Sequence, residues 1–325
     1  MRAIVITQYG GPEVLSIEER PDPPPRLGHV LIEVKAFGVN RAETHMREGK
    51  WPEATEISGI ECVGTVRADP GGRFVPGQKV VAFMGGMGRK INGSYAELTS
   101  VPASNVVAVN TDLTWEQLAA IPESYATAWA ALFGNLDLKS GQTLVVRGAT
   151  SALGRAAVDI AAHAGVRVIA TTRNPERVPS LEALGAKEVL LEAPDLPQRA
   201  RDLHPDGVDA VLELLGNSTV IGSLTMARRH GRLCLAGFLG GTDPINGFMP
   251  VAQMPSGVHF SFFGSFMFGA PAFPTAEIPM QLIVDRVEHG QYKAMAARVF
   301  RFEEIREAHR LMETDSANGK IVVRL

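Results

Sequence analysis

The sequence predicts an α/β protein with two domains, one mainly β and one built around a doubly wound parallel sheet. Three observations support this prediction. The chain has 325 residues, which exceeds the usual size of one compact domain. Near residue 123 its pattern changes from short apolar runs to buried strands alternating with helices. A glycine-containing turn at 148–154 joins the first of these strands to the first helix.

Residues 1–122 have the pattern of β structure. Short apolar runs are separated by Gly, Pro, Asn and Asp at close spacing, and no long helical period occurs. The expected strands include 3–7, 30–34, 63–66, 79–83 and 106–109.

From residue 124 onward, strands that are apolar on both faces alternate with helices, which indicates a parallel sheet covered on both sides. Strands are expected at 143–146, 166–171, 188–191, 208–212, 232–236 and 258–263, and helices at 153–164, 176–184 and 218–229. The C-terminal part returns to a mixed pattern, with helices at 277–288 and 302–313 and strands at 298–301 and 320–325. We therefore expect one domain formed by 1–123 together with 269–325, and a Rossmann dinucleotide-binding domain formed by 124–268.

Composition favours a small-molecule partner. The net charge of −3 gives no basic surface, so binding of nucleic acid is not expected. Two cysteines are too few for a disulfide framework or a four-cysteine zinc site. No signal peptide is expected at the start, and the most apolar region, 260–273, is too short and too interrupted to cross a membrane. These features fit a cytoplasmic enzyme.

The turn after the first buried strand predicts a dinucleotide site. Small residues let a pyrophosphate approach backbone N–H groups at the start of a helix. Only two positions of the turn are glycine, so the alternative is a tight turn of any α/β domain, but a strand before it and a helix after it favour the dinucleotide. The expected contacts are Gly148, Ala149, Thr150, Ser151, Ala152, Leu153 and Gly154.

The end of the second strand of this sheet favours NADPH. NAD-preferring enzymes place an acid there for the ribose hydroxyls, whereas this chain has Thr172, Arg173 and, shortly after, Arg177. Guanidinium groups suit a phosphate through charge-assisted hydrogen bonds. The alternative is a solvated basic turn. Gly216, Gly237 and Phe238 complete the set of expected cofactor contacts.

Several short segments along nearly the whole chain carry a family resemblance. They are Phe37–Thr44, Gly59–Gly64, Phe74–Val80, Gly93–Glu97, Thr127–Leu132, the glycine turn, Leu184–Ala186 and Gly319–Val323. In sequence and order these segments resemble the medium-chain dehydrogenase/reductase superfamily, specifically its quinone oxidoreductase branch.

The resemblance implies a GroES-like, mainly β catalytic domain, completed by the C-terminal segment, beside a Rossmann domain, with the active site between them. It places Asn40 and Thr127 beside the nicotinamide, and Arg173 and Arg177 at the 2′-phosphate. Tyr125, Tyr95 and His45 are candidate proton donors, none of them compelling. Three departures stand out. His45 replaces a common tyrosine, and Glu192 stands near a position where some relatives stack an aromatic residue on the adenine. Ser151 and Ala152 stand where glycines more often occur.

The positions that hold zinc in metal-dependent relatives read Asn40, Ile60 and, approximately, Glu123. An isoleucine supplies no ligand, so we expect no metal. Without a Lewis acid, alcohol oxidation is disfavoured. Reduction of a quinone or an α,β-unsaturated carbonyl by NADPH fits better.

Three alternatives remain open at this point. The chain is compatible with an enoyl-thioester reductase, or with an NADPH-binding structural or RNA-binding protein that has little turnover. Asn40 and Thr127 are also residue types that cap or pack helices.

A homodimer is expected through the sixth strand, 258–263, because an apolar sheet edge with six phenylalanines between Phe260 and Phe273 invites pairing with a second copy.

Overall fold

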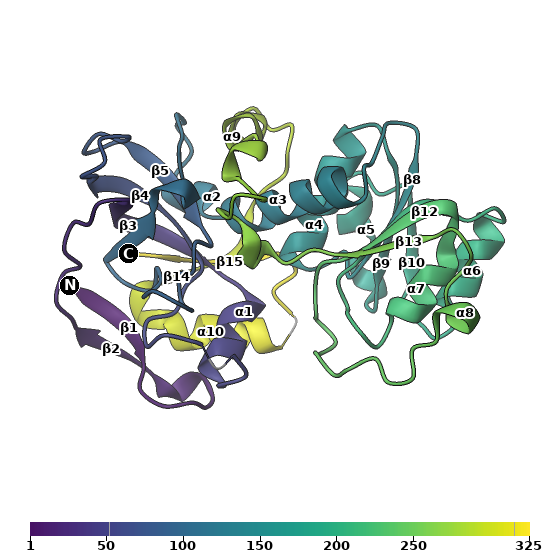
Figure 1. Ribbon diagram of the computed structural model, residues 1–325, viewed down its shortest axis with the longest axis horizontal. Helices are drawn as coiled ribbons and strands as arrows, with labels where there is room; N and C mark the ends of the chain where they lie inside the picture. Colours follow the sequence, from purple (N-terminus) through teal and green to yellow (C-terminus); the bar gives the residue numbers. More distant parts are fainter. Residues whose placement is uncertain (52, 315) are drawn as a thin grey trace. The chain divides into compact units, whose positions relative to one another are not determined.

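The computed structural model describes residues 1–51, 53–314 and 316–325, and the chain divides into two units (Figure 1). The first unit comprises 1–126 and 265–325, and the second comprises 127–264. The boundaries expected from the sequence lie a few residues away from these.

The first unit is mainly β. One sheet has the order β14-β15-β3-β4-β5-β7, with β6 also paired to β3, and β1 and β2 form a separate antiparallel pair. The strands are β1 (Arg2–Ile6), β2 (Leu15–Glu19), β3 (His29–Val39), β4 (Glu61–Ala68), β5 (Lys79–Phe83), β6 (Leu98–Pro102), β7 (Val106–Ala108), β14 (Ala296–Arg301) and β15 (Lys320–Arg324). The helices are α1 (Arg41–Arg47), α2 (Trp115–Leu118), α9 (Met280–Glu288) and α10 (Ile305–Glu313), and α3 (Pro122–Trp129) crosses the boundary between the units.

The two ends of the chain build this sheet together. Strand β15 pairs antiparallel with β3, with Ile321 opposite Val39, and parallel with β14. Figure 1 shows the yellow C-terminal strand β15 among the purple and blue strands of the N-terminal part. Ile321 and Val323 then join the same apolar core as Val30, Ile32 and Phe37.

A buried polar network ties helix α10 to the N-terminal part. Arg47 donates to Nδ1 of His309 at 3.2 Å and contacts the carboxylate of Glu313. An arginine only donates, so Nδ1 accepts and Nε2 carries the proton, which it donates to the hydroxyl of Tyr95 at 3.0 Å. Burial, with the Arg47 charge adding to it, lowers the pKa of His309 to about 3, so the ring is neutral.

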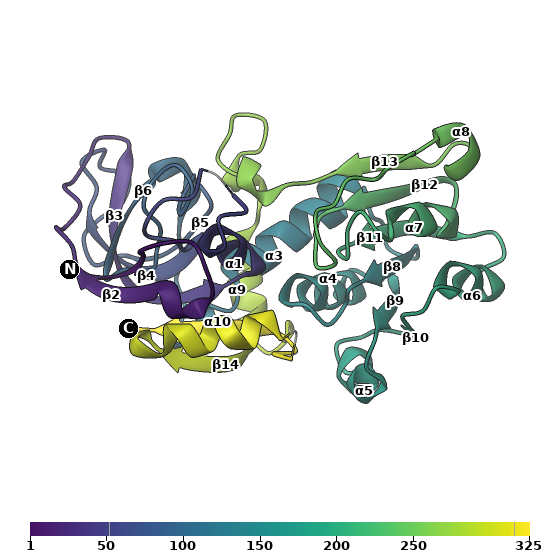
Figure 2. The same ribbon diagram turned by 90° about the horizontal axis from the view of Figure 1, so that it is seen from below.

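The second unit is a parallel sheet with the order β10-β9-β8-β11-β12-β13, the 3-2-1-4-5-6 arrangement of the Rossmann fold. Figure 2 shows α4 on one face and α6 and α7 on the other. The strands are β8 (Thr143–Arg147), β9 (Arg167–Thr172), β10 (Glu188–Leu191), β11 (Val208–Glu213), β12 (Ala227–Leu235) and β13 (His259–Phe262). The helices are α4 (Ala152–His163), α5 (Val178–Glu182), α6 (Leu196–Leu203), α7 (Val220–Met226) and α8 (Pro250–Gln253).

The predicted fold class is confirmed, while some elements differ from expectation. Helix α6 has no counterpart in the sequence-based assignment, because only Leu196 and Ala200 of its eight residues are buried. Residues Ala130–Asn135 form a π-helical segment that was not expected. The helix expected at 218–229 ends at Met226, and strand β12 begins at Ala227. Among the described residues no helix is both long and apolar enough to span a bilayer.

His309 makes the stability of the fold pH-dependent. In the unfolded chain this ring takes up a proton below about pH 6.5, whereas in the folded protein it stays neutral down to about pH 3. The free energy of unfolding therefore falls on acidification through this window, by up to about 1.4 kcal/mol per pH unit. We expect a His309→Gln variant to lack this contribution, since its amide has an acceptor for Arg47 and a donor for Tyr95 but does not titrate.

The measurement is urea unfolding of both proteins at several values between pH 4 and pH 8. The buried Glu43, whose raised pKa acts in the opposite direction, is common to both, so the difference isolates His309. A difference that does not change with pH would contradict the neutral-histidine assignment.

Candidate functional site

The expected site residues are distributed over both units. Asn40, His45 and Tyr125 belong to the first unit, and Thr127 and all expected cofactor contacts belong to the second.

In the second unit, the glycine turn lies at the carboxyl end of β8. Gly148 has φ +87°, a conformation that suits glycine. A β-carbon on Gly154 would clash with the carbonyl oxygen of Gly148, so this glycine permits the close approach of helix α4 to the turn. The two retained glycines therefore stand where the geometry requires them.

Ser151, which replaces a more common glycine, is the N-cap of α4. Its hydroxyl accepts from the N–H of Gly154 at 3.0 Å and donates to the carbonyl of Gly148 at 2.9 Å. Ala152 is the first helical residue and needs no positive φ. The departure from the three-glycine pattern therefore leaves the turn intact and supplies a helix cap.

The end of β9 carries hydroxyl and guanidinium groups. Thr171 Oγ1 accepts from the N–H of Gly148 at 3.2 Å, which links this strand to the glycine turn. Thr172 Oγ1 accepts from the N–H of Asn174 at 3.1 Å and so stabilises the turn that follows the strand. Arg173 is exposed and Arg177 is half-buried. This edge can therefore accept an anionic group.

The remaining expected contacts lie at the same edge of the sheet. Gly216 follows β11 with φ +112°, and its surroundings include the Cα of Phe238. Gly237 and Phe238 follow β12, and the ring centroid of Phe238 lies 6.0 Å from that of Phe262. In doubly wound sheets the carboxyl ends of the strands are where ligands bind.

In the first unit, Asn40 lies on a buried ion pair. Lys320 Nζ contacts Glu61 Oε1 and donates to Asn40 Oδ1 at 2.6 Å. Asn40 Nδ2 donates to Glu61 Oε1 at 2.9 Å. Because the ammonium can only donate, the amide orientation of Asn40 is fixed, with its oxygen toward Lys320.

Glu61 also holds the start of helix α3. Its second oxygen accepts from the N–H of Glu123 at 2.9 Å, a first-turn donor that has no partner within the helix. Ser124 accepts from Lys320 at 3.3 Å. The ion pair thus connects β4, β15, α1 and α3 around one asparagine.

Gly38 makes room for this ion pair. A β-carbon at this position would clash with Cε of Lys320 and Oε1 of Glu61. Lys320 and Glu61 come together because β15 and β4 both pair with β3 near this glycine, with Ile321 opposite Val39 and Val63 opposite Ala36. Glu61 and Lys320 were missed as site residues. The signal available was a charged residue directly before each of two apolar runs, 62–66 and 321–323.

Glu43 is a second buried carboxyl group in this cluster. It accepts from the backbone N–H groups of Asn40 at 2.8 Å and Ile60 at 3.1 Å. Burial raises its pKa to about 7, with Glu61 adding to this and Lys320 opposing it. Asn40 is the N-cap residue of α1, as the capping alternative supposed, and forms a capping box with Glu43. Its side-chain amide is also hydrogen-bonded to Glu61 and Lys320 of the ion pair.

The candidate proton donors differ in accessibility. Burial lowers the pKa of His45, so its ring is neutral at pH 7, and it lies 6.3 Å from the ring of Trp51. Tyr125 is buried and packs its ring 5.8 Å from that of Tyr292. Tyr95 is fully buried with its hydroxyl bonded to His309, so it belongs to the core. Thr127 is buried in α3.

Asn40, Ile60 and Glu123 occupy the positions that hold zinc in metal-dependent relatives. The side chain of Ile60 has no ligand atom, and the amide of Asn40 is hydrogen-bonded to Lys320 and Glu61. The ammonium of Lys320 already supplies the positive charge between Asn40 and Glu61. Both cysteines are buried thiols, Cys62 with a raised pKa and Cys234 with a pKa raised to about 12 by burial. In the described part of the chain, no three His, Cys, Asp or Glu side chains are grouped as metal ligands.

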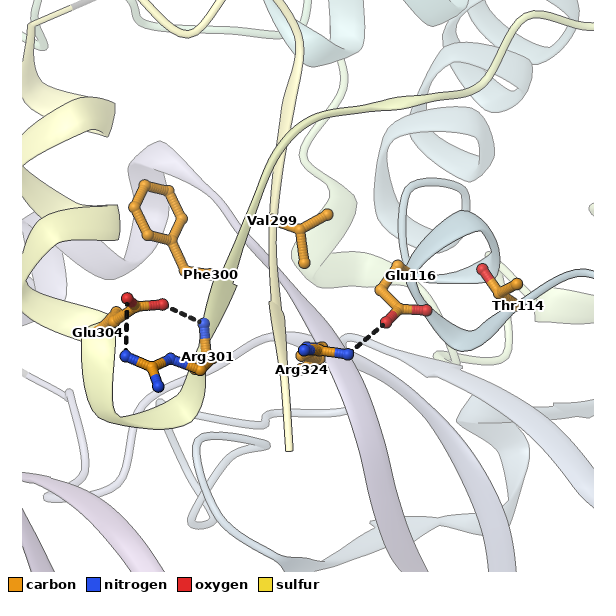
Figure 3. Close-up of a pocket in the computed structure, with 7 residues that line it drawn as sticks. All are labelled: Thr114, Glu116, Val299, Phe300, Arg301, Glu304 and Arg324. Atoms are coloured by element: carbon orange, nitrogen blue, oxygen red, sulfur yellow. Dashed lines mark hydrogen bonds and ion pairs between the residues drawn. The ribbon is translucent and has the colours of Figure 1, made fainter.

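A shallow depression of about 500 Å³ in the first unit lies elsewhere (Figure 3). Its charged residues pair with one another, Arg301 with Glu304 and Arg324 with Glu116. It contains none of the expected site residues. The lining residues are Thr114, Glu116, Val299, Phe300, Arg301, Glu304 and Arg324.

Two family models match this architecture. Residues 26–111 match the alcohol dehydrogenase GroES-like domain, and residues 152–280 match a model described as zinc-binding dehydrogenase. With the Rossmann sheet, these matches define the class of protein as a nicotinamide-dependent oxidoreductase.

Whole-chain comparisons agree with this class. Human quinone oxidoreductase is 29% identical, with 100% of this chain and 98% of the relative covered. A mycobacterial protein solved in complex with NADPH is 29% identical with a TM-score of 0.88, and an NAD-dependent alcohol dehydrogenase is 28% identical with a TM-score of 0.85; both cover 100% of each chain. The chain belongs to the medium-chain dehydrogenase/reductase superfamily, in its quinone oxidoreductase branch.

The ion pair under Asn40 predicts a strong energetic coupling. Lys320→Met leaves the buried carboxylate of Glu61 uncompensated and should lower the free energy of unfolding by about 3–5 kcal/mol. Glu61→Gln should also destabilise the protein. The double variant should lose clearly less than the sum of the two single losses, because neither charge remains. Urea unfolding of the four proteins measures the coupling, and additive losses would show that the pair does not act as a unit.

Proposed function

We propose that this protein is an NADPH-dependent reductase that transfers a hydride to a quinone or an α,β-unsaturated carbonyl without a metal ion. The observation that carries the proposal is the Lys320 ammonium held between Asn40 and Glu61. A divalent cation bound at Asn40 would be repelled by it. The names of the related quinone oxidoreductases support the same activity.

The cofactor half of the proposal rests on the second unit. The turn 148–154 offers backbone N–H groups at the start of α4 for a pyrophosphate. Arg173 and Arg177, after a strand end that has no acid in 171–175, favour the 2′-phosphate of NADPH over the free hydroxyl of NADH. When bound, the cofactor supplies the hydride.

The proposal for the hydride-transfer step rests on the fixed orientation of the Asn40 side chain. The amide of Asn40 is fixed by Lys320 and Glu61, so it offers a pre-set polar group to the nicotinamide or the acceptor. A quinone or enone is already electrophilic, and its oxygen can take a proton from water or a weak donor as the hydride adds to carbon. Alcohols and simple ketones are less reactive toward hydride transfer, which a Lewis acid assists, and the described residues contain no group of three metal ligands.

We expect NADPH to bind at least about tenfold more tightly than NADH, since one charge-assisted hydrogen bond contributes roughly 1.5–3 kcal/mol. Arg173→Asp should erode or reverse this preference. Arg167→Asp, at the opposite end of β9, is the matched charge control and should leave it unchanged. Fluorescence titration gives the dissociation constants, and equal affinities in the unmodified protein would refute the NADPH assignment.

Steady-state NADPH oxidation against a panel of quinones, enones, an enoyl thioester, alcohols and ketones tests the chemistry. We expect turnover of quinones or enones that survives chelation, with well under one zinc per chain. Asn40→Ala should lower kcat roughly tenfold or more while changing NADPH affinity little, and Thr127→Val should act more weakly.

Three outcomes would redirect the proposal. Preference for the thioester would make the enzyme an enoyl-thioester reductase, and absence of turnover would favour a binding role. If Asn40→Ala only lowers the melting temperature and turns over normally, Asn40 is structural.

We further propose that the protein is a homodimer in the cytoplasm, paired through strand β13. This strand is the edge of the second unit's sheet, and Phe262 on it is 52% exposed. Sedimentation equilibrium should give twice the chain mass, and Phe262→Lys should shift the protein toward monomer. A monomer at micromolar concentration would contradict the pairing.

A further inference from the structure

A buried group of charges lies beneath the carboxyl edge of the Rossmann sheet. Arg147, the last residue of β8, has a side chain that is 6% exposed. Its neighbour in register on β11 is Glu213, which is fully buried. Strands β8 and β11 are those between which the strand order reverses, so this group lies at the switch point where dinucleotides bind.

Arg147 is held by several acceptors. Its Nε donates to Glu192 Oε1 at 2.9 Å, and Nη2 contacts the same oxygen. Nη1 donates to the carbonyl of Thr219 at 3.1 Å and to the hydroxyl of Ser223 at 3.0 Å. Glu213 lies 3.8 Å away but accepts from the N–H groups of Leu215 and Gly216 as well. The guanidinium group therefore has one orientation.

Of the two carboxylates, Glu192 depends more on Arg147 for compensation of its charge. Its second oxygen is buried and accepts no hydrogen bond from the described residues. The charge of Glu192 is therefore compensated at the oxygen that faces Arg147, whereas Glu213 has backbone N–H donors of its own.

The position of Glu192 links this pair to the cofactor. Its N–H donates to the carbonyl of Thr172 at 2.8 Å, so it stands beside the end of β9. Strand β9 lies between β10 and β8 (Figure 2), and the side chains of Glu192 and Arg147 therefore meet across the end of β9. This end is where the ribose 2′-substituent of a dinucleotide is held.

We propose that Arg147 is a determinant of cofactor preference, because it neutralises Glu192 at the place where the 2′-phosphate of NADPH would lie. This inference rests on the proposed dinucleotide site. A neutralised Glu192 tolerates the phosphate, which carries a charge of about −1.5 to −2. Without Arg147 the carboxylate repels the phosphate, and it can instead accept hydrogen bonds from the ribose hydroxyls of NADH.

Four proteins test this: the unmodified chain, Arg147→Met, Glu192→Gln and the double variant. The measured quantity is the ratio of the dissociation constants of NADH and NADPH, taken by fluorescence titration at low salt. Arg147→Met should lower this ratio about fivefold or more, and Glu192→Gln should raise it, since the two changes alter the local charge in opposite directions. The double variant should return close to the unmodified ratio.

The ratio of the unmodified protein tests the proposed cofactor, and the change from that ratio tests the role of Arg147, so the two can fail separately. A merely structural Arg147 would weaken both cofactors equally and leave the ratio unchanged, which would overturn the inference. If the double variant has a ratio as low as that of Arg147→Met, the inference is overturned too. If Arg147→Met does not fold, Glu192→Gln decides alone, and a ratio that stays the same or falls refutes the proposal.

Discussion

The ion pair between Glu61 and Lys320 is the constraint around which the first unit is built. Both charges are buried, and each finds its partners only when β3, β4, β15 and the start of α3 are in their observed register. A one-residue slip of β15 would turn Lys320 to the other face of the sheet and leave Glu61 without a cation. The same pair orients Asn40, so the interaction that fixes the strand register also fixes the side chain proposed for catalysis.

Much of the fold was predictable because its signals are local. Apolar strands bounded by turns, and a glycine turn between a strand and a helix, are visible in consecutive residues. Helix α6 was not predicted, because its sequence, Leu196–Leu203, is mostly polar and buries only two side chains. It could have been inferred from topology, since consecutive parallel strands such as β10 and β11 need a crossover between them.

Candidate site residues could be proposed from the sequence only where they are contiguous. The turn 148–154 and the arginines after β9 lie in short segments, so the sequence alone suggests a role for them. Glu61 on β4 and Lys320 on β15 are distant in sequence and meet because both strands pair antiparallel with β3. Arg147 and Glu192 likewise meet across an intervening strand. Ser151 shows the opposite case, in which an apparent defect in a motif is a helix cap.

The contribution of both chain ends to one sheet has a consequence for synthesis. The second unit is one continuous segment, 127–264, so all of its strands are available as soon as that segment has been made. Strand β3, made much earlier, lacks its neighbour β15 until residues 320–324 emerge. A nascent chain thus carries a complete Rossmann sheet while the edge of β3 is still open, and the buried carboxylate of Glu61 receives its cation only after Lys320 has been made.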